Sequence, residues 1–302
     1  MSAWPAGDGS GRAALRTHAP EPAACLDALD VAAPVPRPRL DVVRTAVASV
    51  HGLAPLGGAD ATPDGPDDDA VMEFAVAFAA DVAAIDDDLR ARFLAATGDQ
   101  AFATVQAIYV ADMVPRVRAA LDALFGAGGW DLGERSDEAG TDRADVDTWS
   151  VLEDLMRTVH QLDALDPVTT EVVRLRGARH HDCRLCRSLR SRPALLAGGD
   201  DALWEAVDDP TTLSDPVHRV AVEVVDTVVW TPARWSPDQV AAVRAAVTPG
   251  QAVELVLDVM RNAANKIAVA LAADDPHVTE GVEVYEIDAD GVAHYGLDPI
   301  EP

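Results

Sequence analysis

The stretch EVVRLRGARHHDCRLC, residues 171–186, decides how the rest of the chain is interpreted. It contains two cysteines in C-x-x-C spacing, Cys183 and Cys186, and the histidines His180 and His181 precede them. Arginines crowd both sides of the thiols, although the chain as a whole is strongly acidic. The pattern leaves three interpretations open: a zinc site, a redox dithiol and a basic surface helix.

Segments on both sides of this stretch have apolar residues at the spacing of one helix face. A helix is expected to begin near Arg39, and further helices are expected over 70–85, 87–97 and 98–125. Later in the chain the same pattern covers 150–162, 166–198, 215–230, 236–247 and 249–274. Prolines stand at several of these starts, a position that suits proline: Pro167, Pro216 and Pro237. Residues 282–297 alternate around an Asp-Gly pair and predict a small β-hairpin.

The two halves of the chain resemble each other, which indicates a tandem duplication. A shift of 130 positions places Arg44 on Arg174 and His51 on His181, and it sets leucines where the second half has its cysteines. A shift of 151 positions aligns Gln100 with Gln251. The expected organisation is a disordered tail over 1–36, a degenerate helical repeat over 37–126, a linker over 127–147, a second repeat over 148–275 and a C-terminal hairpin or tail over 276–302.

The net charge and the cysteine count of the chain exclude several classes of partner and of cysteine chemistry. The formal net charge of −27 repels phosphate backbones and anionic membranes, so we expect neither nucleic acid nor a membrane as a partner. The first residues lack the apolar region of a secretory signal, so a cytoplasmic protein is expected. Three cysteines do not make a secreted disulfide framework, and a C-x-x-C pair is then redox-active or metal-binding. Cys25, in the expected tail, is interpreted as an incidental thiol.

The dithiol stretch and the later segment AVELVLDVMRNAANKIAVAL, residues 252–271, together resemble the carboxymuconolactone decarboxylase/alkylhydroperoxidase D-like (AhpD-like) family. Eleven residues separate Glu171 from Cys183, as in the redox members of that family, and Asn262 and Asn265 match its packing helix. The resemblance covers about residues 150–273 well, and about 39–125 only as a degenerate copy. It implies an all-α fold of two helical bundles packed as an internal pseudo-dimer, and it implies further homo-oligomerisation.

The resemblance also implies a thiol-dependent peroxidase or disulfide oxidoreductase. Cys186 attacks a hydroperoxide or disulfide, Cys183 resolves the intermediate to an intramolecular disulfide, and a thioredoxin-like or lipoyl protein returns the electrons. The sequence departs from the family at both histidine positions of its proton relay, which are Leu185 and Arg190 here.

Without the two family histidines, other residues would have to promote thiolate formation and accept its proton. A free cysteine is mostly protonated at neutral pH, and nearby arginines would increase the thiolate fraction. Arg190 can replace the missing histidine electrostatically but cannot accept a proton. Glu171 is therefore the first candidate base, followed by His181 and His180. A solvated basic face, or a docking surface for an acidic neighbour, is the alternative explanation of the arginines.

Three other functions stay open. A non-catalytic or redox-responsive scaffold would explain the lost histidines. A metal site would use His180, His181, Asp182, Cys183 and Cys186, although no second ligand pair is evident. A lactone decarboxylase is the third. We expect no cofactor and no metal. We expect an apolar pocket where the helix that carries Glu171 and the dithiol meets the helix around Asn262.

Overall fold

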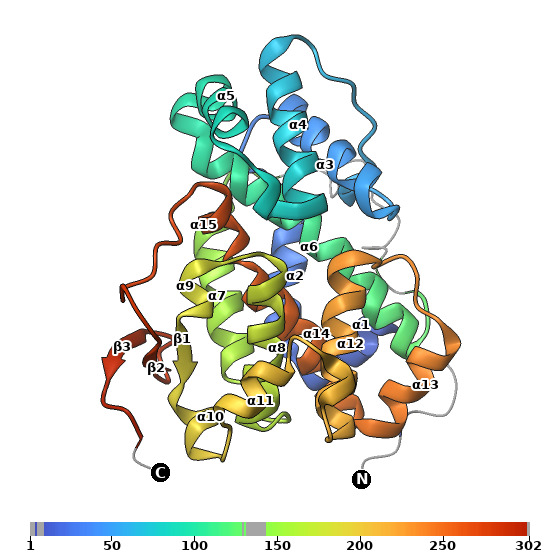
Figure 1. Cartoon of the computed structure of the whole chain (residues 1–302). Helices are drawn as coiled ribbons and strands as arrows, with labels where there is room; N and C mark the ends of the chain where they lie inside the picture. Colours follow the sequence, from blue (N-terminus) through green and yellow to red (C-terminus); the bar gives the residue numbers. More distant parts are fainter. Residues whose placement is uncertain (1–3, 5–8, 129, 131–142, 301–302) are drawn as a thin grey trace.

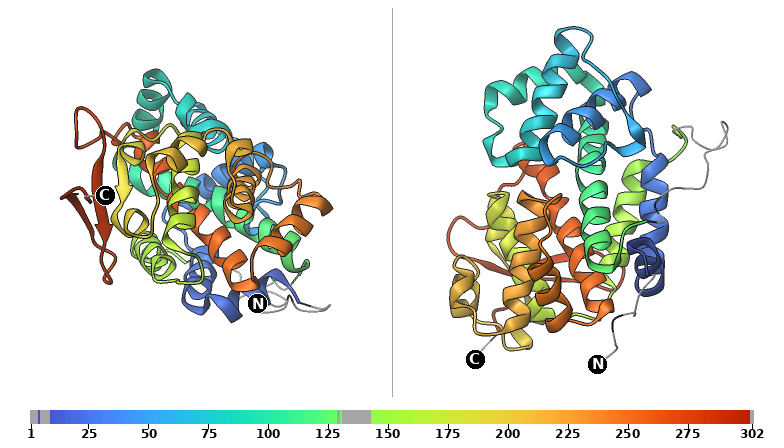
Figure 2. Two further views of the ribbon diagram at one scale, coloured as in Figure 1. Left: turned by 60° about the horizontal axis from the view of Figure 1, so that its bottom comes forward. Right: turned by 90° about the vertical axis from the view of Figure 1, so that its right-hand side faces the viewer.

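A computed structural model describes residue 4, residues 9–128, residue 130 and residues 143–300. Helices make up most of this chain, and a small sheet lies at one edge of the helical body (Figures 1 and 2). The predicted helical architecture with C-terminal strands is therefore confirmed. The expected linker over 127–147 falls largely on residues 129 and 131–142, which lie outside the described residues.

The N-terminal segment forms two packed helices, α1 (Gly11–His18) and α2 (Pro20–Val31). Leu15 and Leu29 are fully buried, because α1 packs against α6 and α2 against α7. Gly11 approaches α6 so closely that a Cβ there would lie 2.7 Å from the backbone of Leu121. The prediction of a disordered tail over 1–36 is thus wrong for residues 11–31. Few large apolar residues mark these helices, and their burial depends on partners distant in sequence.

The first run of core helices comprises α3 (Arg37–His51), α4 (Pro66–Asp81), α5 (Asp87–Thr97) and α6 (Ala101–Phe125). Short 3-10 turns lie at Leu56–Gly58, Val82–Ala84 and Gly98–Gln100. The rings of Phe74 and Phe93 stack at 3.8 Å in the core between α4 and α5. The predicted helices of this half agree with the structure because their apolar faces are long and regular.

The second run contains α7 (Thr148–His160), α8 (Pro167–His180), α9 (Arg184–Arg187), α10 (Arg192–Leu196), α11 (Asp201–Ala206), α12 (Pro216–Trp230), α13 (Pro237–Ala246), α14 (Pro249–Ala263) and α15 (Lys266–Ala270), with a 3-10 turn at Pro210–Thr212. Side chains that accept backbone N–H groups cap the major helix starts, among them Asp166, Asp215, Ser236 and Thr248. Each is followed by a proline at the first helical position, as predicted for Pro167, Pro216 and Pro237. The helical pattern over 166–198 is not one helix in the structure: α8 ends at His180, Asp182 adopts a left-handed φ of 47°, and the cysteines lie on the next turn of helix.

A three-stranded sheet joins the dithiol segment to the C-terminus. The predicted hairpin is confirmed: β2 (Glu283–Ile287) and β3 (Ala293–Leu297) pair antiparallel around Gly291, whose φ is 84°. β1 (Leu189–Ser191) adds to β2 in parallel, with Arg190 opposite Val284. The sequence did not predict β1. The sheet therefore holds the segment after the cysteines against the C-terminal hairpin (Figure 1).

The two runs of helices are joined through a buried polar contact between α6 and the α14–α15 region. Asp112 is paired with Arg116 at 2.7 Å and with Lys266, the only lysine of the chain, at 2.6 Å. The Tyr109 hydroxyl also donates to the Met260 carbonyl at 2.6 Å. Such pairs are tolerated in a core because each charge has a partner.

No single helix among the described residues has both the length and the apolar composition of a membrane span. One pair, Pro237–Ala246 and Pro249–Ala270, has both only when taken together and is bent by 115°.

Candidate functional site

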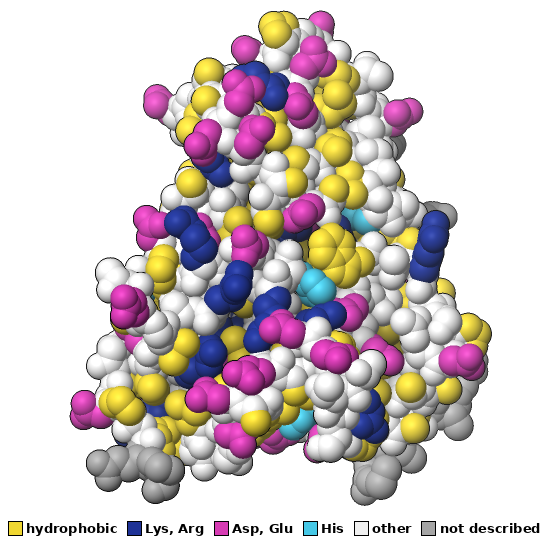
Figure 3. Space-filling view, in the orientation of Figure 1, with side chains coloured by type: hydrophobic (Ala, Val, Ile, Leu, Met, Phe, Trp, Pro, Cys, Tyr) yellow, Lys and Arg dark blue, Asp and Glu magenta, His cyan; other side chains and the backbone are white. Residues whose placement is uncertain are grey.

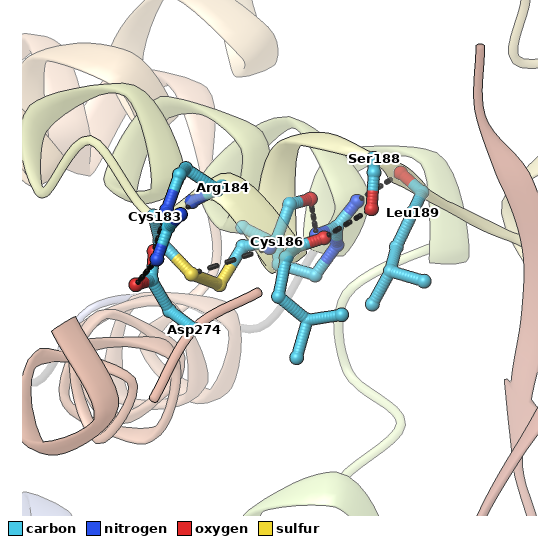
Figure 4. Close-up of a disulfide and its surroundings, with 8 residues drawn as sticks. Cys183, Arg184, Cys186, Ser188, Leu189 and Asp274 are labelled. Atoms are coloured by element: carbon cyan, nitrogen blue, oxygen red, sulfur yellow. Dashed lines mark hydrogen bonds and ion pairs between the residues drawn. A yellow bond between two sulfur atoms is a disulfide. The ribbon is translucent and has the colours of Figure 1, made fainter. Parts of the chain in front are cut away.

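The two cysteines lie at the corner between α8 and α9. They form a disulfide, and the N–H of Cys186 donates to Cys183 Sγ at 3.2 Å, so Cys183 caps α9 (Figure 4). The Cys183 side chain is 1% exposed and that of Cys186 is 4% exposed. Asp274, beside Cys183, accepts from the Arg184 backbone and side chain. Burial raises the pKa of Asp274, but the hydrogen bonds from Arg184 outweigh burial and keep this pKa below its ordinary value.

A cavity of about 560 Å³ opens beside the disulfide. Cys186 lines it and Cys183 does not, so the second cysteine of the pair is the one that borders the cavity. Asn262 and Asn265 form another part of the wall, which places the cavity where the dithiol segment meets the α14–α15 region, as expected from the sequence. The expectation that this pocket is apolar holds only in part, because charged side chains from α7, α8 and α14 line it together with the apolar ones.

Glu171 is buried at 1% exposed and is held in an ion pair. Arg174 donates to both of its carboxylate oxygens at 2.6 Å, and the backbone N–H of Ser191 donates to it at 3.1 Å. Arg174 also donates to the carbonyl of Cys186 at 2.6 Å. Glu171 therefore reaches the dithiol through Arg174 and the backbone of Cys186. This is a positioning contact, and the carboxylate is engaged by a permanent cation.

The two histidines before the cysteines point to different surroundings. His180 Nε2 lies 2.6 Å from Asp226 on α12, and its Nδ1 accepts from Trp230 at 3.1 Å. His181 is buried, and burial together with the nearby Lys266 lowers its pKa well below the ordinary value. His180 is thus engaged with α12. His181 is held neutral beside the polar contact that joins the two runs of helices.

The arginines around the dithiol are mostly paired with carboxylates rather than directed at the sulfurs. The pairs are Arg174 with Glu171, Arg176 with Asp226, Arg179 with Asp208, Arg184 with Asp274 and Asp275, and Arg187 with Asp182. Arg190 donates to the carbonyls of Arg187 and Leu189, and burial lowers its pKa. On the face in Figure 3, Lys and Arg side chains gather near the middle with Asp and Glu among them. The cluster therefore fastens neighbouring segments together, which explains its positive charge without a thiolate field.

One histidine that the sequence analysis did not single out lines the dithiol cavity. His160, at the end of α7, shares this cavity with Cys186, and its Nε2 is 3.2 Å from the carbonyl of Ile287. A carbonyl can only accept, so Nε2 carries the hydrogen and Nδ1 is left as the basic nitrogen. Burial and then Arg261 lower the pKa of His160, which favours this neutral form. Only its tertiary position marks it, because nothing in MRTVHQL distinguishes it from a surface residue.

A second cavity of about 310 Å³ adjoins the first, and His160, Arg174, Arg261, Tyr285 and Ile287 line both. Its distinctive residues are two carboxylates of α14, Glu254 and Asp258. Burial raises the pKa of Glu254 to about 7, and the charge of Asp258 adds to this. Burial likewise raises the pKa of Asp258 to about 6. In the sequence, both residues are indistinguishable from the polar positions of an amphipathic helix.

The residues proposed for a metal site do not converge on one point. His180 contacts Asp226, Asp182 pairs with Arg187, and the two cysteines are joined to each other. Across the described parts of the chain, no group of three or more His, Cys, Asp or Glu side chains is placed to hold a metal ion. The metal interpretation of this segment is therefore wrong for the structure observed.

Fold and site together define a mainly helical protein with a C-x-x-C disulfide in the wall of a cavity. The chain is 42% identical over 240 residues to uncharacterized protein Rv2313c of Mycobacterium tuberculosis (strain ATCC 25618 / H37Rv), which covers 78% of this chain and 83% of the relative. Uncharacterized protein MT2376 of strain CDC 1551 / Oshkosh matches equally well. The chain belongs to the family of these proteins. No family model matches it, and no solved structure matches it.

Proposed function

We propose that this protein is a thiol-dependent oxidoreductase of the AhpD-like type, which reduces a hydroperoxide or a disulfide with Cys183 and Cys186. The observation that carries the proposal is the asymmetry of the pair: Cys186 lines a cavity of about 560 Å³, while Cys183 is buried behind it within bonding distance. A reacting thiol needs access to its substrate, and a resolving thiol needs access only to its partner.

The steps balance as a two-electron cycle. The Cys186 thiolate attacks the outer oxygen of a hydroperoxide, the O–O bond breaks, and an alcohol and a Cys186 sulfenic acid form. Cys183 then attacks the sulfenic sulfur, a disulfide forms, and water leaves. An external dithiol, such as a thioredoxin-like or lipoyl protein, reduces the disulfide by exchange and is itself oxidised. The cytoplasm, where thiols are kept reduced, is the compartment in which such a cycle would run.

His160 is the residue that we assign to proton transfer in this cycle. It lines the same cavity as Cys186, and its hydrogen bond to Ile287 leaves Nδ1 as an acceptor. It would accept the Cys186 proton through a water in the cavity and return it to the departing alkoxide. Glu171, engaged by Arg174, would instead hold Arg174 on the Cys186 carbonyl and so position the thiol.

The order of helices supports the proposed duplication. Four helices of the first run correspond in order to four of the second: α3, α4, α5 and α6 to α8, α12, α13 and α14. Pro167, the first residue of α8, stands 130 positions after Arg37, the first residue of α3. Arg44 is buried against the turn at Gly57, where a Cβ would meet its Nη1 at 2.9 Å, much as Arg174 contacts the Cys186 backbone. We propose that the two runs are tandem AhpD-like bundles forming a pseudo-dimer, and that the protein forms homo-oligomers.

The test measures hydroperoxide consumption with a small dithiol as reductant, together with reduction of a small aromatic disulfide. We expect Cys186→Ser to fall to the rate of the dithiol alone. We expect Cys183→Ser to retain one reaction with peroxide but to fail in disulfide formation. Cys25→Ser, which alters a cysteine outside the cavity, is the matched control and should match the parent. Equal peroxide consumption by Cys186→Ser and the parent would refute the proposal.

The assignment of His160 has its own test. His160→Gln retains a donor for Ile287 but no base, so the rate is expected to fall by about 100-fold, as for the loss of a general base. The inflection near the histidine pKa should disappear from the pH profile, an effect that a structural role would not produce. His294→Gln, which changes an exposed histidine of β3, is the control.

A redox-responsive scaffold is the second candidate. The near-complete burial of both sulfurs and the engagement of Glu171 by Arg174 favour it. In that case both cysteine variants would lose stability without any change in peroxide consumption.

A further inference from the structure

The second cavity has the properties of a ligand site that is separate from the dithiol. It encloses about 310 Å³, within the range of small-molecule pockets, between the end of α7, the start of α8, α14 and β2. Apolar side chains form much of its wall, including Val159, Leu162 and Leu165. Cys186 does not line it. An inference about this cavity therefore does not rest on the proposed redox function.

The polar end of the cavity is built by two carboxylates one helical turn apart. Glu254 and Asp258 lie at i and i+4 on α14, where like charges repel. Asp258 is 2% exposed, and its Oδ2 has no hydrogen-bond partner among the residues that the structure describes. Glu254 Oε2 accepts from the N–H groups of Ala164 and Leu165 at 2.7 and 3.2 Å. An unsatisfied buried carboxylate oxygen beside a cavity indicates a missing donor.

The cations near the cavity do not supply this donor. Arg174 is committed to Glu171 and to two backbone carbonyls. Arg261 forms a long ion pair with Asp258, in which Nη1 lies 3.6 Å from Oδ1, and this contact leaves Oδ2 without a donor. Asp163 and Glu171 line the cavity as well, so its four carboxyl groups outnumber its two arginines, Arg174 and Arg261. Glu254 and Asp258 do not belong to a metal-binding group of three or more side chains among the described residues, and two carboxylates fall short of the six or so oxygens that hard cations take.

We propose that this cavity binds a small aliphatic amine as its ammonium ion, seated between Asp258 and Glu254 with its hydrocarbon part against Val159, Leu162 and Leu165. An ammonium group has three donors and no acceptor, which suits two carboxylates in a largely apolar chamber. The raised pKa values of Glu254 and Asp258 agree with this geometry, because burial of the two carboxyls outweighs the opposing charge of Arg261 beside Asp258. An arriving cation would lower both pKa values and release a proton.

The experiment is calorimetric titration of the full chain with n-butylammonium chloride. n-Butanol and sodium butyrate serve as probes of similar size but different charge. We expect butylammonium to bind at one site with a dissociation constant of about 1 mM or tighter. The two other probes should bind about tenfold more weakly or not at all. Repeating the titration near pH 6.5 in two buffers of different ionisation enthalpy should reveal proton release on binding.

Asp258→Asn and Glu254→Gln keep the shape of the site and remove its charge. Each should weaken butylammonium binding by about tenfold or more and reduce the proton release. Asp60→Asn, at an exposed loop position, is the matched control and should bind as the parent does. The proposal would be overturned if butanol bound as tightly as butylammonium or if butylammonium did not bind. It would also be overturned if both site variants bound butylammonium as tightly as the parent does. Cys186→Ser should bind normally, which separates this result from the fate of the redox function.

Discussion

Replacing Asp258 with asparagine is predicted to stabilise the protein, although the residue lies in the core. The pKa of this carboxyl is raised from its ordinary value of 3.8 to about 6, chiefly by burial. A raised folded-state pKa means that the protonated form stabilises the fold below pH 4. That stability is lost as the pH rises through 6, because the native state must then carry a buried charge.

The magnitude follows from the difference between the two values. Two pKa units or slightly more correspond to about 3 kcal/mol of stability that is absent above pH 6. Asparagine fits the same space without a charge, but it gives up the attraction to Arg261. We therefore expect Asp258→Asn to raise the free energy of unfolding by about 1–3 kcal/mol at pH 8. The gain should shrink to near zero at pH 4.

Urea denaturation followed by circular dichroism at pH 4, 6 and 8 would measure this difference. Asp60→Asn, in an exposed loop, should leave the free energy of unfolding unchanged at every pH. A loss of stability on Asp258→Asn at pH 8, or a gain that is the same at pH 4 and pH 8, would show that burial does not dominate the energetics of this carboxyl. A confirmed gain would mean that the natural residue weakens the fold, as functional groups often do.

Three other substitutions test the fold. Asp112→Ala leaves Arg116 and Lys266 buried without their carboxylate, so we expect a loss of about 3–5 kcal/mol in urea denaturation; an effect under 1 kcal/mol would contradict the buried pair. Burial, with help from Arg116, lowers the pKa of His51 from 6.5 to about 4, so the neutral ring stabilises the fold above pH 6.5 and about 3 kcal/mol is lost as the pH falls through 4. His51→Asn should remove that acid sensitivity, and an unchanged stability profile between pH 4 and 6.5 would argue against it. Leu15→Ala should cost about 2–5 kcal/mol if α1 belongs to the core, whereas a loose N-terminal segment would show no change in melting temperature.

The parts of the fold that the sequence predicted are those determined locally. Long apolar faces with a proline at the first turn fixed the major helices near Pro167, Pro216 and Pro237. The Asp-Gly turn likewise predicted the hairpin. α1 and α2 escaped notice because they carry few large apolar residues and depend on α6 and α7 for burial. β1 escaped because three residues gain strand character only by pairing with a strand far along the chain.

The candidate site likewise has a part that local sequence predicted and a part that depends on distant residues. The spacing of Cys183 and Cys186 predicted a dithiol from the sequence, and in the structure the two form a disulfide of which Cys186 borders a cavity. The ion-pair partners of the arginines could not be predicted from the sequence, because the carboxylates come from other elements, such as Asp226 on α12. His160 and Asp258 acquire their chemistry only from burial and neighbours, which no linear pattern encodes.

The single lysine has a practical consequence for studying this protein. Lys266 is only 4% exposed and lies against the ring of Phe78, so the native surface offers acylating reagents no side-chain amine among the described residues. Slow acetylation of that ε-amine would then report how often the α6–α15 junction opens, residue-specifically and without an engineered label. Lys266 is thus a natural probe of local opening between the two runs of helices.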